Sequence, residues 1–359
     1  MTEDVHVIAS MDTVAVRLRA PRAVVGELDR LAAPYITTTA AETTHEETYE
    51  ELPSVLFTSE PPEGDGWERV VNSSEYEPDR VVWADRTRRS VAVVGDPVPT
   101  AWQSQQLLRS VRHLLRWQAY ARGDLLLHGG LVSAQGAGIV FTGGKRSGKT
   151  SSILSSLLHA KADFVSNDDV ALTESAGGLV GYGTPRTVNI RTDSLLALAE
   201  TAPGMKELLR DCAHPTNGYR GRHRTLETLT TDSGTELPGS LWVRCAELAR
   251  ATGCSLSPRG TVDAVVLPKF DGATQEPRIE PLTPEEAGAA LQEHIEWQGT
   301  KYDPFLAEWF PETDAGRRQR LVERLVAEVP FLALTQNMHG LGAATDLVVA
   351  AALGAPARP

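Results

Sequence analysis

The feature that most constrains the fold of this chain is the motif Gly-x-x-x-x-Gly-Lys-Thr at residues 143–150. An apolar run precedes it at residues 138–141, and apolar residues at helical spacing follow it over residues 151–158. A strand, a glycine-rich loop and a helix in this order make an anion site, because loop N–H groups and the positive end of the helix dipole point at one place. The sequence therefore predicts a nucleoside triphosphate site in an α/β fold, with the loop at the carboxyl end of a strand in a mixed sheet.

The residues of this loop have separate expected roles. Glycines let the backbone curl so that its N–H groups face an anion. Lys149 would reach the outer phosphates, and the hydroxyl of Thr150 would ligate Mg²⁺. The residues predicted to bind the nucleotide are Gly143, Gly144, Lys145, Arg146, Ser147, Gly148, Lys149, Thr150 and Ser151.

The composition is that of an ordinary globular chain. Of its 359 residues, 41% are hydrophobic and 23% are charged, and the net charge of −12 argues against a surface that coats nucleic acid. The three cysteines have neither the number nor the spacing of a disulfide framework or a zinc site. The N-terminus lacks a signal-peptide pattern, and the most apolar stretches are too short to cross a bilayer. We expect a cytoplasmic protein with no nucleic-acid or membrane partner, and the sequence leaves open whether it forms a homo-oligomer.

A break rich in Gly and Pro at residues 95–99 divides the chain into two predicted regions. Residues 1–98 are predicted to form a β-rich region that contains a hairpin over residues 80–95. Residues 37–51 are rich in Thr and Glu, which predicts a flexible loop. Residues 99–359 are predicted to form the phosphate-loop domain, and its first helix would run over residues 100–122 with Thr100 as its cap.

Two adjacent carboxylates, Asp168 and Asp169, interrupt an apolar run about one helix beyond the loop. One of them could hold Mg²⁺, and the other could accept a proton from an attacking hydroxyl. A regular strand would point the two side chains to opposite faces, whereas a turn would let them converge. A solvated Asp-Asp turn is the alternative, and the position after the phosphate loop favours a role in the reaction. His128, near the strand before the loop, could assist a nucleophile or be a core histidine.

Three arginines are candidates for contact with phosphate or substrate. Arg186 and Arg191 follow a Gly-Thr-Pro turn and could clamp the transferring group, although surface ion pairs would explain them equally well. Arg222 belongs to a basic group in the polar segment 213–237, which predicts a long loop. The sequence Thr-Lys-Tyr-Asp at 300–303 matches a guanine-reading motif by chance, because the strand that should precede it is missing.

Residues 127–132, 138–150 and 164–169 together resemble the catalytic core of the HPr kinase/phosphorylase family, which includes related kinases of bacterial peptide natural-product clusters. The likeness consists of a His-Gly pair before a strand, the phosphate loop, and a Val-x-x-Asp-Asp segment one helix further on. It implies that residues 99–359 form a phosphate-loop kinase core of the type shared with phosphoenolpyruvate carboxykinase. It also implies ATP and Mg²⁺ as cofactors.

The resemblance further implies roles for individual residues. Lys149 would bind the β- and γ-phosphates and Thr150 would bind Mg²⁺. One carboxylate of the pair Asp168 and Asp169 would be the general base, and the other would lie near the metal, with Asp169 as the candidate ligand. His128 would support them. The sequence does not decide between the two carboxylates, and it does not separate ATP from GTP or pyrophosphate.

The family's Glu-Ile-Arg-Gly segment is absent from this chain, so neither phosphorolysis nor an HPr partner is expected. The function predicted from the sequence is an ATP-dependent kinase that transfers the γ-phosphate to a Ser or Thr hydroxyl of a peptide or small protein. A kinase acting on a metabolite hydroxyl and a non-catalytic nucleotide-binding scaffold are the alternatives.

Overall fold

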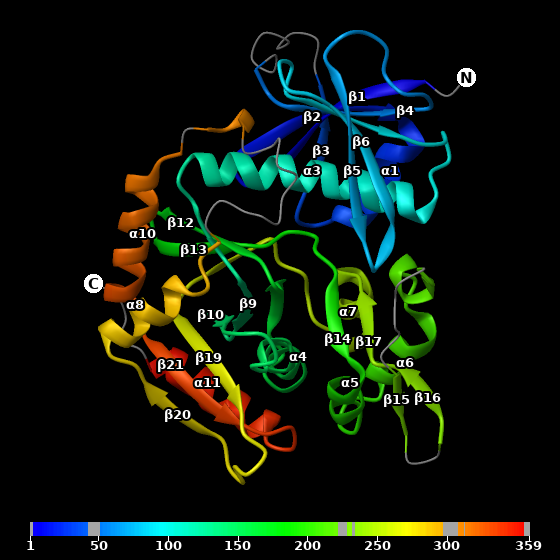
Figure 1. Cartoon of the computed structure of the whole chain (residues 1–359). Coiled ribbons are helices and arrows are strands. Elements are labelled where there is room, and N and C mark those ends of the chain that lie inside the picture. The colour runs from blue at the N-terminus through cyan, green and yellow to red at the C-terminus, as the bar shows by residue number, and fades with distance from the viewer. Residues whose placement is uncertain are drawn as a thin grey trace. The chain divides into compact units, whose positions relative to one another are not determined.

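The computed structural model describes residues 3–41, 51–221, 228–231, 234–296, 308–311 and 313–354 (Figure 1). The chain divides into two compact units, which we describe separately. Unit 1 comprises Met1–Arg122, His214–Arg224 and Gln298–Asp314, and unit 2 comprises Gly123–Ala213, Thr225–Trp297 and Ala315–Pro359. Because the first long helix packs against the N-terminal strands, the predicted boundary between residues 98 and 99 lies inside unit 1.

Unit 1 contains a seven-stranded sheet with strand order β3-β1-β2-β4-β7-β6-β5. Its strands are β1 (Asp4–Met11), β2 (Val14–Pro21), β3 (Thr37–Ala40), β4 (Ser54–Thr58), β5 (Trp67–Ser74), β6 (Glu77–Asp85) and β7 (Ser90–Val94), and its first helix is α1 (Arg22–Ala32). The predicted hairpin is confirmed, because β6 and β7 pair in antiparallel fashion. The predicted loop from residue 37 is wrong at its start, where three β-branched threonines form edge strand β3 against β1. Residues 42–50 of that segment lie outside the described residues.

Helix α3 (Ala101–Ala121) packs against α1 and against strands of the seven-stranded sheet, chiefly β2 and β7. Its predicted cap is confirmed: the backbone N–H of Gln103 donates to Thr100 Oγ1 at 3.3 Å, and the Thr100 N–H donates to Gln103 Oε1 at 2.7 Å. This reciprocal pair satisfies two donors that a helix start leaves open. A short 3₁₀ turn, η2 (Pro215–Gly218), also belongs to unit 1.

Unit 2 contains a six-stranded mixed sheet with strand order β11-β9-β10-β19-β21-β20. Its strands are β9 (Gly129–Ala134), β10 (Ala137–Thr142), β11 (Asp163–Ser166), β19 (Ala264–Phe270), β20 (Arg278–Pro281) and β21 (Phe331–Gln336). Strand β19 runs parallel to both β10 and β21, so the carboxyl ends of these three strands meet at one edge. The other pairings are antiparallel, which confirms the prediction of a mixed sheet in an α/β fold.

A second sheet of unit 2 has the order β18-β13-β12-β8. Its strands are β8 (Leu125–Leu127), β12 (Val170–Ser175), β13 (Gly178–Tyr182) and β18 (Arg259–Thr261). Two-stranded ribbons are formed by β14 (Val188–Arg191) with β17 (Ser240–Val243), and by β15 (Thr228–Thr230) with β16 (Glu236–Pro238). The helices are α4 (Lys149–His159), α5 (Thr192–Ala199), α6 (Gly204–Asp211), α7 (Cys245–Thr252), α8 (Pro284–Gln292), α10 (Ala315–Glu328) and α11 (Leu341–Gly354). The predicted loop 213–237 thus contains η2 and ribbon strands.

The core of unit 2 joins its two larger sheets. A cluster of fully buried side chains includes Leu131 and Val140 of the six-stranded sheet, Leu172 of the four-stranded sheet, Leu291 of α8 and Leu325 of α10. Every residue of β10 is buried, as expected for a strand that is covered on both faces. The strand that leads into the phosphate loop is therefore held from both sides.

Helix α4, which follows the loop, packs against the C-terminal helix α11. Ser155 Oγ donates to the carbonyl of Leu341 at 2.8 Å and lies 2.7 Å from Thr345 Oγ1. All three side chains are buried. These contacts join two helices that are far apart in the sequence.

The apolar run that the carboxylate pair interrupts is two strands in different sheets. Strand β11 ends at Ser166 in the six-stranded sheet, and β12 begins at Val170 in the four-stranded sheet. Asp168, between them, has a left-handed backbone with φ of 66°. Residues 167–169 are therefore a turn that carries the chain from one sheet to the other.

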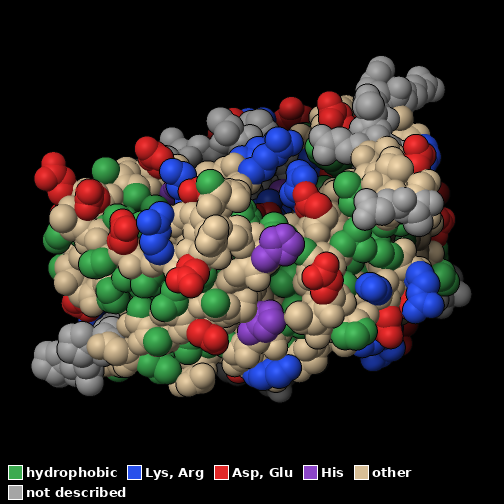
Figure 2. Space-filling model, turned by 90° about the horizontal axis from the view of Figure 1, so that it is seen from below, with side chains coloured by type: hydrophobic (Ala, Val, Ile, Leu, Met, Phe, Trp, Pro, Cys, Tyr) green, Lys and Arg blue, Asp and Glu red, His purple; other side chains and the backbone are tan. Residues whose placement is uncertain are grey.

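Charges of both signs are spread over the surface. Asp and Glu side chains lie interspersed with Lys and Arg side chains on the face drawn in Figure 2. None of the helices in the described part of the chain is both long enough and apolar enough to cross a membrane.

We expect Leu131→Ala to lower the free energy of unfolding by about 2–5 kcal/mol, because the removed side chain fills a closed core. Leu131 is 0% exposed. Chemical denaturation measures the change. As a control, Leu347→Ala truncates a side chain that is 38% exposed on α11 and should change stability by less than about 0.5 kcal/mol. Equal losses in the two variants would contradict the described core.

Candidate functional site

The loop between β10 and α4 has the backbone of an anion-binding nest. Gly143, Arg146 and Gly148 have positive φ angles of 147°, 66° and 109°. At Gly148 a Cβ atom would also lie 2.7 Å from Cε2 of Phe270, the last residue of β19. Only glycine fits that position without strain, so the second glycine of the motif is required by both conformation and packing.

Lys149 points back into this loop. Its Nζ donates to the carbonyl oxygens of Gly143 at 2.6 Å and Gly144 at 2.9 Å, and the residue is 8% exposed. A buried ammonium group needs such partners. The positive charge of Lys149 therefore lies inside the loop between β10 and α4. Lys145 and Arg146, in contrast, are exposed.

The hydroxyl of Thr150 faces an amide. Thr150 Oγ1 donates to Asn167 Oδ1 at 3.3 Å, and Asn167 is 2% exposed. Gly130 of β9 allows this approach, because a Cβ there would lie 2.4 Å from Ile153 Cδ1 and 3.1 Å from Asn167 Cα. The sequence analysis missed Asn167, although it directly follows the buried strand β11 and precedes the carboxylate pair.

Three buried polar atoms around the loop have no hydrogen-bond partner among the described residues: Ser147 Oγ, Asn167 Nδ2 and Gln336 Oε1. Gln336 ends β21, and its Nε2 donates to Ser152 Oγ of α4 at 2.7 Å. Each buried polar group that stays unpaired lowers the stability of the folded protein by about 1–3 kcal/mol. Such atoms in one place indicate groups that await a polar ligand.

The two carboxylates have different surroundings. Asp169 is 1% exposed, and it accepts hydrogen bonds from Thr184 Oγ1 at 2.8 Å and Arg186 Nη1 at 3.4 Å. Asp168 is half-buried, and its carboxylate has no hydrogen bond or ion pair with any residue that the structure describes. The turn at 167–169 therefore gives each carboxylate a separate environment.

His128 is fixed against the backbone of this turn. Its Nδ1 lies 3.1 Å from the carbonyl oxygen of Asp168. A carbonyl can only accept, so Nδ1 carries the hydrogen in this contact, and in the neutral ring Nε2 is then the acceptor. The backbone of His128 is held as well, because Thr142 Oγ1 donates to its carbonyl at 2.9 Å.

His294, two residues beyond the end of α8, is a further residue that the sequence analysis missed. Its carbonyl accepts from the N–H of His128 at 2.8 Å. Burial of the imidazole and the nearby charge of Lys149 lower the pKa of His294 below its ordinary value of 6.5, and His128 acts in the same direction. The side chain therefore lies within electrostatic reach of the phosphate-loop lysine.

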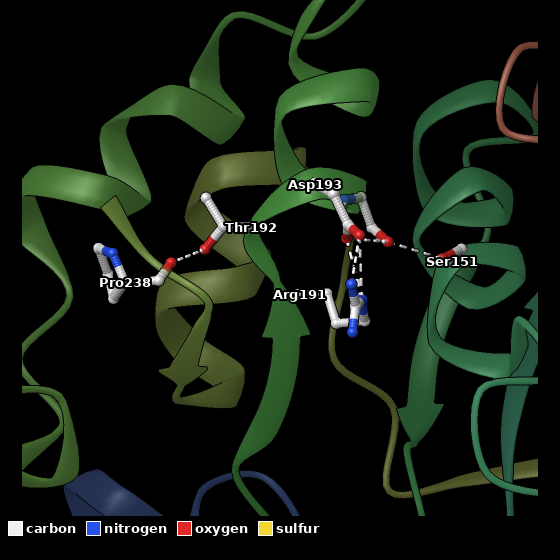
Figure 3. Close-up of polar contacts among 6 residues, drawn as sticks. Ser151, Arg191, Thr192, Asp193 and Pro238 are labelled. Carbon is white, nitrogen blue, oxygen red and sulfur yellow. Dashed lines mark hydrogen bonds and ion pairs between the residues drawn. The ribbon is translucent and has the colours of Figure 1, made fainter. Parts of the chain in front are cut away.

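Arg191, the last residue of β14, is paired with the carboxylate of Asp193 in the first turn of α5. Its Nη2 donates to Asp193 Oδ2 at 2.5 Å and its Nε lies 3.1 Å from both oxygens, as Figure 3 shows. Burial alone would raise the pKa of Asp193, but the bonds from Arg191 and the Ser194 N–H bring it below 3.8. Ser151 Oγ donates to Ser194 Oγ at 3.3 Å, so this pair is connected to the start of α4. Thr192 donates to the carbonyl of Pro238 beside it.

Of the predicted site residues, the structure brings His128, Asp168 and the loop from Gly143 to Ser151 into one region of unit 2. Arg186 reaches the turn through Asp169, whereas Arg191 forms the ion pair that the sequence analysis gave as the alternative. Arg222 and residues 300–303 lie outside the described residues.

The residues present fit a magnesium ion that arrives with a nucleotide. No group of three or more His, Cys, Asp or Glu side chains that could hold a metal occurs in the described part of the chain. Mg²⁺ in such sites keeps several waters and takes few protein ligands beside the phosphates. The Thr150 hydroxyl and the unpaired buried amide of Asn167 provide such a sparse set of groups.

The lowered pKa of His294 predicts a pH dependence. Because the folded protein binds this proton more weakly than the unfolded chain, the contribution of His294 makes the free energy of unfolding fall as pH drops below 6.5. An NMR titration should give a His294 pKa below 6.5, and Lys149→Met should raise it. The control Lys161→Met, at an exposed lysine, should leave it unchanged. A His294 pKa that does not respond to Lys149→Met would contradict the described proximity.

No family model and no curated protein matches this sequence. Among solved structures, the Hpr(Ser) kinase/phosphatase from Coxiella burnetii is similar over 63% of this chain and 94% of its own length, with 9% sequence identity and a TM-score of 0.27. A likeness of that size carries no argument about site or reaction.

Proposed function

We propose that unit 2 binds ATP together with Mg²⁺ and transfers the γ-phosphate to a hydroxyl group. The observation that supports this most directly is the closed phosphate loop with Lys149 inside it, surrounded by the unpaired buried atoms of Ser147, Asn167 and Gln336. A triphosphate has the oxygens and the negative charge that such a set of groups would satisfy.

Positioning and charge neutralisation supply most of the catalysis in phosphoryl transfer. The loop N–H groups and Lys149 would bind the phosphates, Thr150 would hold the magnesium ion, and Asp169 remains the alternative ligand. When bound, Mg²⁺ neutralises charge that develops on the phosphates. Arg186, half-exposed and anchored by Asp169, is placed to meet a transferring or incoming anionic group.

Asp168 is the stronger candidate for the general base. Its carboxylate is free of partners among the described residues and partly open to solvent, so it can accept the proton of an incoming hydroxyl. His128 fixes the backbone of Asp168 through the 3.1 Å contact to its carbonyl. Asp169 is already occupied by Thr184 and Arg186 and suits an anchoring role.

The acceptor that we propose is a Ser or Thr hydroxyl of a peptide or small protein. Support for this choice comes from the ordered motifs of the sequence, which resemble those of kinases that act on such hydroxyls. A metabolite hydroxyl would use the same base and the same phosphate site. Label transfer to a peptide pool or to a metabolite pool distinguishes the two acceptor classes.

We expect Asp168→Asn to reduce phosphoryl transfer by about 10²–10⁴-fold while ATP affinity is kept, because only proton transfer is removed. Asp169→Asn should cause a smaller loss through weaker anchoring of Arg186. Transfer of label from γ-labelled ATP to a peptide pool and, separately, to a metabolite pool measures both variants and the acceptor class.

Asp163→Asn, on the same strand that leads into the turn, is the matched control and should leave transfer unchanged. Full transfer by Asp168→Asn would exclude Asp168 as the base. ATP binding without transfer to either pool would favour the non-catalytic scaffold over the kinase.

A further inference from the structure

The Thr150 hydroxyl faces a neutral side chain at the place where a charged one is expected. In phosphate-loop enzymes, Mg²⁺ is held by the loop Ser or Thr and by an Asp carboxylate beside it. Here Thr150 Oγ1 donates to the amide oxygen of Asn167 at 3.3 Å. Asp169 is bound to Thr184 and Arg186 instead, and the Asp168 carboxylate makes no hydrogen bond to a described residue.

The amide is held firmly in this place. Asn167 is 2% exposed, and it follows Ser166, whose Oγ accepts the N–H of Leu131 at 3.1 Å. Behind it, Gly130 leaves no room for a side chain, since a Cβ there would approach Asn167 Cα to 3.1 Å. The left-handed Asp168 then turns the chain away. The fold thus fixes residue 167, and not 168 or 169, opposite Thr150.

The chemistry of the amide suits two partners at once. Because the Thr150 hydroxyl gives its hydrogen to Asn167 Oδ1, its lone pairs stay available to a cation. Asn167 Nδ2 is buried and unpaired among the described residues, and it can donate to a phosphate oxygen, which a carboxylate cannot do. A neutral amide also adds no charge of its own to attract a cation.

We propose that Asn167 is the positioning residue of the magnesium site: it orients the Thr150 hydroxyl toward a cation that enters with the nucleotide, and it leaves the protein without a tight site for the cation alone. This inference rests on the proposed function, because it assumes that a nucleotide binds at the loop.

The test compares ATP affinity in Mg²⁺ with ATP affinity in EDTA, measured by calorimetry on the full chain. The dissociation constant in EDTA divided by the dissociation constant in Mg²⁺ isolates the contribution of the metal. Asn167→Ala should reduce this ratio by about 10-fold, the usual effect of removing a residue that orients a metal ligand. Asn189→Ala is the matched control, because the Asn189 amide is also bonded to a hydroxyl, in this case by donating from Nδ2 to Ser240 Oγ at 3.3 Å. Its ratio should equal that of the wild type.

A second variant keeps the test valid if Asn167→Ala does not fold. Asn167→Asp has the same shape and adds a carboxylate, a ligand that hard cations prefer. Without nucleotide, it should bind Mn²⁺ about 10-fold more tightly than the wild type or Asn189→Asp. In a double-mutant cycle, the effects of Thr150→Ala and Asn167→Ala on the ratio should not add, because both remove one interaction.

An unchanged ratio in Asn167→Ala, or additive effects in the cycle, would overturn the role of Asn167 while wild-type ATP binding still supported the proposed function. An Asn167→Asp protein that gains no Mn²⁺ affinity would do the same. Failure of the folded wild type to bind ATP under either condition would overturn both proposals.

Discussion

The crossing of the chain from one sheet to another at residues 167–169 determines the chemistry of this site. Strand β11 ends in the six-stranded sheet and β12 starts in the four-stranded sheet. The three polar residues between them belong to neither strand, so their side chains need not alternate between the two faces of a sheet. Asp168, in the middle, has a left-handed backbone conformation, and the three side chains have different contacts. One side chain meets the phosphate-loop threonine, one is left without a described partner, and one anchors an arginine.

The phosphate loop depends on its surroundings as much as on its own motif. The carboxyl ends of β10, β19 and β21 meet at one edge, which brings Phe270 and Gln336 against Gly148. Neither residue belongs to the motif, yet each limits how the loop can be built. Lys149 stabilises the curved shape of the loop by donating to the carbonyls of Gly143 and Gly144.

Local patterns predicted the local elements correctly: the loop with its strand and helix, the β6–β7 hairpin, and the capped start of α3. The β3 strand was missed because its threonines gain stability from pairing with β1, a contact that composition does not reveal. The roles of Asn167 and His294 also depend on distant contacts. His294 lies near the site because Ile295 pairs with Leu127. The turn at residues 167–169 depends on the presence of two sheets, which the sequence pattern does not reveal.

The hydrogen bonds of Ser155 to Leu341 and Thr345 connect α11 to the helix that follows the loop at residues 143–150. The small hydroxyl side chains of Ser152 and Ser155 on α4 meet Gln336 and α11. A shortened chain that stops before α11 would expose these hydroxyls to water and release the helix whose first residues form the loop. A shorter fragment that keeps the loop at residues 143–150 intact must therefore retain α11, because Ser155 of α4 bonds to Leu341 across 186 positions of sequence.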